Sequence, residues 1–382
     1  MDFALTEEQL MFRDTVRKFC QNEIAPIAAE TDRTHEFPLS TFKKLAELGM
    51  TGIPIPEEYG GAGGSYLDFA IFVEELAKVC ASTAVIMSVH TGLACMSTWL
   101  YGNERIREKY LRPLAQGEIV GAYALTEPNA GSDAGNIRCR AEDKGDHFIV
   151  NGTKIFITNG GVASVYVTFV KSDPSQPRGR GITCLLIEKD TPGFTIGKPI
   201  EKMGLNGSPT CELIFDNCKV PKENVLGEVN DGFKVAMGLL DGGRITIGAQ
   251  GLGIGEGALE YVTNYVKERR QFDRPLAANQ AVQFMIADMA TALEAAQLLV
   301  YRAAWLKDNG LPHTKEASMA KKFATDTAMD VCVKCVQLMG GYGYCKEYPV
   351  ERMMRDVKVT QIYEGANEIH RMIISRAILG KF

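Results

Sequence analysis

The sequence predicts a mainly helical protein with a central antiparallel β domain. Apolar residues recur with helical spacing up to residue 118, and they do so again from residue 231 to the end. Between them, short β-branched and aromatic runs alternate with turn residues. We therefore expect an N-terminal helical domain at 1–118, a β barrel or sandwich at 119–230, and a C-terminal helical bundle at 231–382.

The N-terminal domain carries clear helix boundaries. Thr6 and Gln9 form a capping box that begins a helix running to about residue 29. A second helix begins near Pro38 and ends at Gly49. After a loop rich in Gly and Pro, helices are expected at 65–79 and 83–100, and Asn103 caps a short helix running to residue 115.

The β domain is expected to hold strands at 137–142, 147–150, 154–158, 165–170, 183–188 and 212–215. Asn151-Gly152 is a strong turn signal between two of them. In the last domain, long helices are expected at 233–270, 279–308, 315–339 and in the final segment, which favours an up-and-down four-helix bundle.

Composition excludes several classes of protein. The net charge is -5 with mixed signs, which argues against a nucleic-acid binder. No apolar run reaches the roughly 20 residues that cross a bilayer, so membrane insertion is not expected. The chain opens directly into a capped helix without a signal or transit peptide, which predicts a cytoplasmic, bacterial-type location.

Cysteine and histidine spacing predict neither a disulfide framework nor a metal site. The 10 cysteines are scattered, which indicates reduced thiols. Cys332 and Cys335 form a CxxC inside a helical pattern, so a structural role is favoured over redox chemistry. The 5 histidines show no paired-ligand spacing.

A glycine-rich stretch at 251–258 mimics a dinucleotide fingerprint, because a strand-like run at 244–250 precedes it. The second strand and its acidic residue are missing, however. A helix whose small residues let another group pack closely is the better interpretation.

Glu364 lies between Tyr363 and Gly365, just before a C-terminal helical pattern. The neighbouring Tyr363 ring would exclude water from this carboxylate and so make it a better base. The residues alone leave open the plainer alternative, an acidic residue that complements a helix dipole.

Two further sequence motifs, together with this stretch, resemble one protein family. Residues 124–133 read ALTEPNAGSD and are similar to the first signature of the acyl-CoA dehydrogenase family of flavoproteins. Residues 337–344 read QLMGGYGY and, with Glu347, Arg352 and Asp356 after them, are similar to the second. The stretch around Glu364 resembles the catalytic segment. The motifs cover essentially the whole chain in the expected order, so the resemblance implies this family's fold.

The resemblance implies an FAD cofactor, shared between the subunits of a homotetramer that is a dimer of dimers. Residues expected to line the flavin and its diphosphate are Tyr123, Leu125, Thr126, Gly131 and Ser132, with Phe156 and Thr158 covering it from the β domain. Residues expected to reach the FAD of a neighbouring subunit are Arg269, Gln271, Phe272, Gln280, Gln337, Gly340 and Gly341. Ala366 and Glu368 match two further FAD contacts.

The resemblance also implies a reaction in fatty acid or carboxylic acid degradation. Glu364 would remove the α-proton of an acyl-CoA while the β-hydride moves to flavin N5, and electrons would then pass to electron-transfer flavoprotein. Ser132, Asp241 and Arg244 match residues that hold the CoA part, and Tyr363 and Gly365 would bracket the acyl thioester. Backbone donors would stabilise the developing enolate.

The chain departs from the family pattern at a few positions. Ala366 replaces the usual Thr, Asp273 a common Gly, and Phe156 a frequent Trp, while Asn136 is unusual at the end of the first signature. Some branches place their base just before the helix Arg, a position that is Gly243 here, which leaves Glu364 as the base.

The acyl group is expected to lie between 88–93, where His90 either lines the pocket or packs in the core, and the small residues of 248–255. Those small residues favour a short, branched or alicyclic acyl group. An acyl-CoA oxidase and a non-catalytic acyl-CoA-binding flavoprotein are the alternatives that the sequence leaves.

Overall fold

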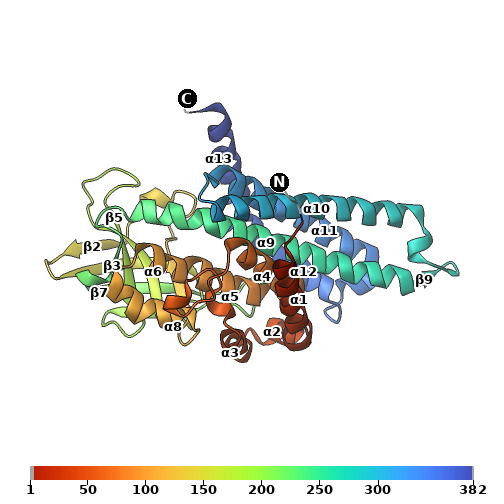
Figure 1. Cartoon of the computed structure of the whole chain (residues 1–382), viewed down its shortest axis with the longest axis horizontal. Coiled ribbons are helices and arrows are strands. Elements are labelled where there is room, and N and C mark those ends of the chain that lie inside the picture. Colours follow the sequence, from red (N-terminus) through yellow and green to blue (C-terminus); the bar gives the residue numbers. More distant parts are fainter. Residues whose placement is uncertain (1–3, 381–382) are drawn as a thin grey trace.

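The computed structural model describes residues 4–380 and shows a helical, a β and a second helical part in that order (Figure 1). The N-terminal helices are α1 (Glu7–Phe19), α2 (Ala28–Thr34), α3 (Leu39–Glu47), α4 (Tyr66–Val79), α5 (Ala81–Val89), α6 (Met96–Tyr101), α7 (Glu104–Ile106) and α8 (Arg112–Ala115). The capping box at Thr6 and the Asn103 cap are both present.

Three expected N-terminal helices are not continuous α-helices. In the one capped by Asn103, a π-helical turn at Arg107–Leu111 separates α7 from α8. A π-helical turn at Cys20–Ile24 and a 3-10 turn containing Pro26 follow α1. Another π-helical turn, His90–Cys95, separates α5 from α6. These turns change the hydrogen-bond ladder without breaking the helical spacing of apolar residues, so the sequence pattern does not reveal them.

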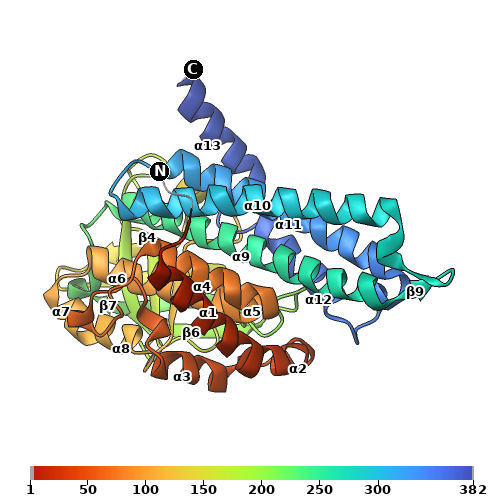
Figure 2. The same ribbon diagram turned by 45° about the vertical axis from the view of Figure 1, so that its right-hand side comes forward.

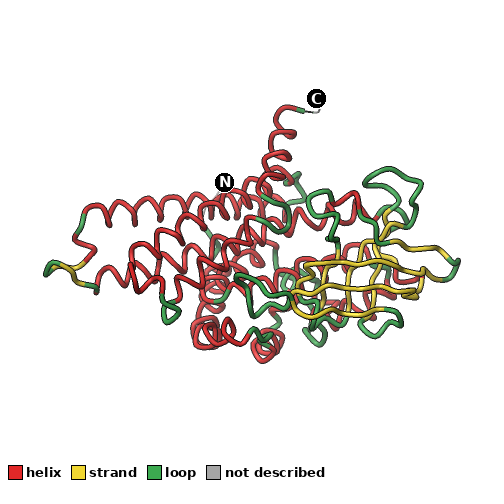
Figure 3. The backbone as a smooth tube through the Cα atoms, turned by 180° about the vertical axis from the view of Figure 1, so that it is seen from behind, coloured by secondary structure: helices red, strands yellow, loops and turns green. Residues whose placement is uncertain are grey.

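The β domain is a sheet of eight strands, β1 (Gly121–Ala124), β2 (Arg140–Asp143), β3 (His147–Thr158), β4 (Val165–Lys171), β5 (Ile182–Glu188), β6 (Phe194–Pro199), β7 (Thr210–Pro221) and β8 (Val225–Leu226). Its order is β6-β7-β3-β2-β4-β5-β8, and β1 pairs with β4. Most pairings are antiparallel, but β1 and β2 run parallel to β4. The strands gather at one end of the molecule (Figure 3).

The turn expected at Asn151-Gly152 is wrong, because β3 continues through it. The register of β3 against β7 shifts between Val150 and Gly152, which marks a β-bulge. Gly152 has φ 144°, and a Cβ there would lie 2.7 Å from Cys139 Cα. The glycine therefore permits a close strand crossing instead of a reversal.

The C-terminal part contains α9 (Gly232–Glu268), α10 (Gln280–Asp308), α11 (Thr314–Met339), α12 (Pro349–Lys358) and α13 (Asn367–Leu379), and the short strands β9 (Arg270–Gln271) and β10 (Arg274–Pro275) connect α9 to α10. The first three helices run side by side (Figure 2). The final segment is two helices instead of one, and α13 stands away from the body (Figures 1 and 2).

The glycine-rich stretch lies wholly inside α9, so the strand-like reading of 244–250 is wrong. A Cβ at Gly253 would lie 2.2 Å from the Glu74 carbonyl oxygen, and one at Gly257 would lie 2.3 Å from that of Lys78. These glycines allow α9 to pack directly against α4, which confirms the close-packing interpretation.

Two stretches of the described chain are long and apolar enough to cross a membrane by length and composition alone, Ala81–Tyr101 and α10. The first is 89% buried inside the protein, as a core helix is. By contrast, α10 is only 22% buried, so it presents apolar surface that has no cover within one chain.

Candidate active site

Glu364 lies in a tight turn between a 3-10 turn at Val359–Gln361 and α13. Its backbone is left-handed, with φ 52°, and Gly365 follows with φ 99°. A left-handed Glu is strained, and such strain clusters at functional sites. The turn directs the carboxylate onto α9, where a Cβ at Gly243 would lie 1.9 Å from Glu364 Oε2.

The carboxylate of Glu364 is placed to act as a base near neutral pH. The residue is half-buried, but its Oε2 is enclosed and has no hydrogen-bond partner among the described residues. Burial raises the pKa of Glu364 to about 7, against the lowering effect of the charges on Arg244 and Lys321. A general base works best when its pKa lies near the working pH.

Arg244 is held beside Glu364 and keeps one N–H group free of intramolecular hydrogen bonds within the described chain. The residue is only 6% exposed, and its guanidinium forms an ion pair with Asp241, which also accepts from the Thr314 hydroxyl. The Nε of Arg244 is buried without a partner in the described chain. An unpaired buried donor is costly, so this N–H is suited to donate to a ligand.

Three buried tyrosines, Tyr363, Tyr66 and Tyr123, lie near enough to Glu364 for its charge to raise their pKa. The Tyr363 hydroxyl donates to Gln250 Oε1, and the Gln250 amide donates to the Ala81 carbonyl at 3.0 Å. The hydroxyls of Tyr66 and Tyr123 are buried without partners in the described part. Burial raises the pKa of both, and the nearby Glu364 charge raises it further, so both stay neutral donors.

The first signature is held by a buried ion pair that the sequence did not reveal. Lys154 Nζ lies 2.8 Å from Glu127 Oε1 and donates to the Leu125 carbonyl at 3.0 Å. Glu127 also accepts from the backbone N–H groups of Arg138 and Cys139. This pair fixes the loop that carries Leu125 and Thr126 onto β3.

The residues around this loop fit a flavin. Phe156 has a left-handed φ of 60°, and its ring is 60% exposed, which is unusual for a bulky residue inside a strand. Thr158 is half-buried further along β3, and a Cβ at Gly131 would meet nothing within 4 Å. An exposed aromatic face, a nearby hydroxyl and open backbone are the features that a flat ring with a diphosphate requires.

The other expected FAD residues do not join this group within one chain. The β9–β10 hairpin lies at the end of the helical layer opposite the sheet (Figure 1), and Phe272 at its tip is 95% exposed. The Arg269 guanidinium lies 5.3 Å from the Tyr342 ring, which brings the second signature to the same end. Gln271, Gln280, Gln337, Gly340 and Gly341 are exposed there, while Ala366 and Glu368 lie beside the base, at the start of α13.

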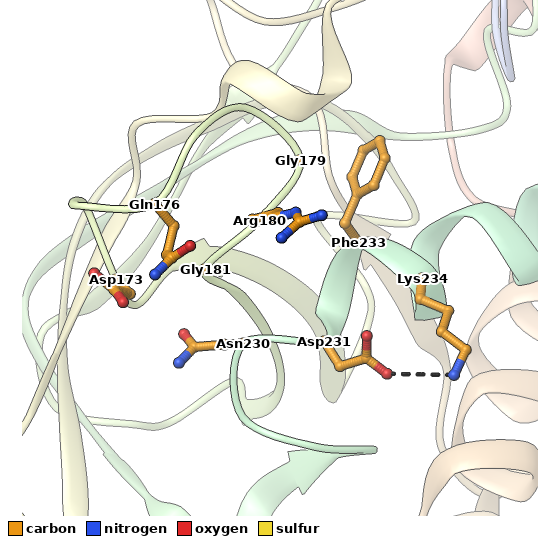
Figure 4. Close-up of a pocket in the computed structure, with 9 residues that line it drawn as sticks. All are labelled: Asp173, Gln176, Gly179, Arg180, Gly181, Asn230, Asp231, Phe233 and Lys234. Atoms are coloured by element: carbon orange, nitrogen blue, oxygen red, sulfur yellow. Dashed lines mark ion pairs between the residues drawn. The ribbon is translucent and has the colours of Figure 1, made fainter.

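A polar pocket of about 410 Å³ adjoins the end of the first signature (Figure 4). Its lining includes Arg180, Asp231 and Lys234, with Lys234 paired to Asp231. The loop bearing Arg180 is tied to the signature, because Gly179 N donates to the Gly135 carbonyl at 2.9 Å. Exposed Ser132 lies three residues before Gly135.

Two sequence motifs have structural roles. His90 packs in the core, with Nε2 3.0 Å from the Leu114 carbonyl and Nδ1 accepting from Gly121 N at 3.1 Å, so it does not line a pocket. Cys332 and Cys335 are buried free cysteines within α11, and burial raises the pKa of both thiols. Inert buried thiols fit the structural reading of the CxxC.

Comparison with known proteins identifies all three parts of the chain. Family models described as the N-terminal, middle and C-terminal domains of acyl-CoA dehydrogenase match residues 6–118, 122–218 and 230–379. A short-chain specific acyl-CoA dehydrogenase of Clostridium acetobutylicum is 52% identical, with 99% of this chain and 100% of that protein covered.

Solved structures agree in fold over the whole chain. The butyryl-CoA dehydrogenase of Megasphaera elsdenii superposes with a TM-score of 0.97 and 46% identity, covering 99% of this chain and 100% of that chain. A chain from a study of the electron transferring flavoprotein of Acidaminococcus fermentans superposes with a TM-score of 0.98 and 49% identity, covering 100% of both chains.

Proposed function

This chain belongs to the acyl-CoA dehydrogenase family, oxidoreductases that act on a CH–CH bond, and from that premise we propose that it converts a short-chain acyl-CoA to the 2-enoyl-CoA with Glu364 as the base. One observation supports this assignment above the others. Glu364 Oε2, which is enclosed and has no hydrogen-bond partner among residues 4–380, points at α9 beside Arg244, and burial raises the pKa of this carboxyl to about 7. No plain capping role requires a strained turn that buries a carboxylate.

The proposed roles combine these positions with the family resemblance of the surrounding motifs. When bound, FAD supplies the acceptor for the β-hydride. Glu364 takes the α-proton onto its carboxylate, and Arg244, with Asp241 and Ser132, holds the CoA part. Tyr363 and Gly365 bracket the thioester, and the Glu364 backbone N–H donates to its carbonyl oxygen. A donor aimed at a developing enolate in a dry site is worth more than it is in water.

The polar pocket of Figure 4 is proposed to receive the phosphate-bearing end of CoA. It supplies the cations Arg180 and Lys234 beside the segment that carries Ser132. Arg and Lys both recognise phosphate oxygens.

A short acyl group is favoured over a branched or alicyclic one. The small residues of α9 suggest a wide cavity from sequence alone, but in the structure those glycines face packed atoms. A Cβ at Gly248 would lie 3.2 Å from Val300 Cγ2, and one at Gly255 would lie 2.8 Å from Leu293 Cδ2. The names of the Clostridium and Megasphaera relatives support the short-chain reading.

The partners are proposed to be an electron-transfer flavoprotein and further copies of this chain. The neighbouring structure from the Acidaminococcus flavoprotein study supports the first. The exposed apolar side chains on α10, the hairpin and α13 support a homotetramer, because such surface is normally covered in solution: Phe272, Phe284, Leu298, Trp305, Met372 and Ile378. Assembly would bring the hairpin residues to the FAD of a neighbouring subunit.

Anaerobic bleaching of the flavin tests the proposal. Butyryl-CoA should bleach the purified protein faster than octanoyl-, isobutyryl- or cyclohexanecarboxyl-CoA, and Glu364→Gln should remain yellow but unbleached. Bleaching by the Glu364→Gln variant would refute the base. Oxygen consumption by the reduced wild type, at the rate of turnover, would indicate an oxidase instead.

A further inference from the structure

Lys321 on α11 is a buried cation that the reaction described above does not use. Its side chain is fully buried, on a helix face shared with the buried alanines Ala317 and Ala324. Its Nζ donates to the Gly365 carbonyl at 2.8 Å and to Asn367 Oδ1 at 2.9 Å. No carboxylate lies within ion-pair distance among the described residues, and a buried unpaired ammonium is costly.

Both bonds of Lys321 reach the turn that carries Glu364. Gly365 and Asn367 are the first and third residues after the base. Asn367 is held a second time from α11, because its amide donates to Thr325 Oγ1 at 3.0 Å and to Asp326 Oδ1 at 2.7 Å. The left-handed turn is thus fixed to α11 from its C-terminal side, while the carboxylate points to α9.

Lys321 also acts on Glu364 through its charge. After burial, which raises the pKa of the carboxyl, Arg244 and Lys321 are the two charges that lower it. The tyrosines and the histidine that face the site are neutral, since burial raises the pKa of Tyr66, Tyr123 and Tyr363 and lowers that of His370 to about 3. Asp241, the carboxylate beside Arg244, is ion-paired with it. Burial lowers the pKa of Lys321 itself to about 7, while Glu364, Asp326 and Glu368 act to keep it charged.

We propose that Lys321 is a positioning residue for the catalytic base, which holds the strained Glu364–Gly365 turn and keeps the carboxylate ionised at neutral pH. This inference rests on the proposed function, because it gives Glu364 the role of base. It goes further in assigning the tuning of that base to a residue on a different helix.

The pH profile of kcat/KM for butyryl-CoA tests the electrostatic part. Lys321→Gln keeps a hydrogen-bond donor but removes the charge, so the acidic limb of its pH profile should move to higher pH by about one unit. At pH 6, kcat/KM should therefore fall about tenfold in addition to any change in its plateau value. Lys321→Arg should keep the limb near the wild-type position. Lys334→Met is the matched control, because it removes a cation from the same helix at an exposed pair with Asp330.

A second measurement does not depend on turnover. The pH dependence of the unfolding midpoint, compared between each protein and its Glu364→Gln partner, reports the pKa of Glu364 directly. In the Lys321→Gln background this pKa should lie higher than in the wild type. An unchanged acidic limb and an unchanged Glu364 pKa, in a variant that keeps its flavin, would overturn the proposal.

The two hypotheses fail in different ways. Full activity of Glu364→Gln would remove the base assignment, whatever Lys321 does. An inactive Glu364→Gln, together with wild-type profiles for Lys321→Gln, would remove only the role of Lys321.

Discussion

The carboxylate of Glu364 lies directly against Gly243, because a Cβ added to Gly243 would lie 1.9 Å from Glu364 Oε2. The two residues are on different elements, the middle of α9 and the turn before α13. A carboxylate at this position could therefore come from a side chain on α9 or from the turn before α13. Because residue 243 is glycine, α9 supplies none, and the carboxylate comes from Glu364 in the turn.

Gly243→Ala should displace the carboxylate of Glu364, the proposed base, without removing it. We expect kcat to fall about 100-fold, since a misplacement of about 1 Å costs that much in a positioned reaction. Flavin content should stay at the wild-type level. Gly238→Ala is the control, because its added Cβ would meet only the flexible Tyr101 hydroxyl, at 2.7 Å. Wild-type kcat in Gly243→Ala would show that the carboxylate does not need this position.

Glu364→Gln should stabilise the protein at alkaline pH. The folded pKa of Glu364 is raised to about 7 from 4.5, so its ionised form is disfavoured on folding. That cost is fully present above pH 7, shrinks as pH falls, and is absent below the unfolded pKa. One pKa unit corresponds to about 1.4 kcal/mol, so the gain at pH 8 should reach up to about 3 kcal/mol. Denaturant unfolding at pH 8 and pH 5 checks this, and an equal effect at both would contradict it.

The helical parts could be predicted because their signals are local. The caps at Thr6 and Asn103 and the apolar spacing of α4 each specify their own element. The bulge at Gly152 could not be predicted, because its cause is the approach of Cys139, the residue just before β2. Asn-Gly carries the same local signal in a turn and in a bulge.

Ordered motifs single out Glu364 as the proposed base, but the residues that support it could not be predicted from the sequence. Lys321 lies four residues before Thr325 on an ordinary helix, and its partners come from the turn more than 40 residues later. A lysine among small buried residues was the one available signal, and spacing alone does not separate it from a solvated lysine. The buried Lys154–Glu127 ion pair could not be predicted for the same reason, because its two residues lie 27 positions apart in the sequence.

Lys154→Met should unfold the protein more easily and loosen its flavin. It leaves Glu127 charged and buried, which typically costs about 3–5 kcal/mol. The double variant Lys154→Met with Glu127→Gln should recover part of that loss, because no buried charge remains. Urea unfolding and the ratio of flavin to protein absorbance measure both effects. A double variant less stable than the single one would show that Glu127 finds another partner.

Phe272→Ala should weaken assembly and flavin retention together. The ring is 95% exposed at the tip of the β9–β10 hairpin, in left-handed backbone with φ 51°. A single chain provides no reason to hold a phenyl ring in water, whereas a neighbouring subunit does. Light scattering should show a smaller particle on dilution, and dialysis should remove more flavin than from the wild type. Met11→Ala is the control, since Met11 is similarly apolar and 71% exposed on α1. A Phe272→Ala variant that keeps both its mass and its flavin would refute a shared FAD site at this hairpin.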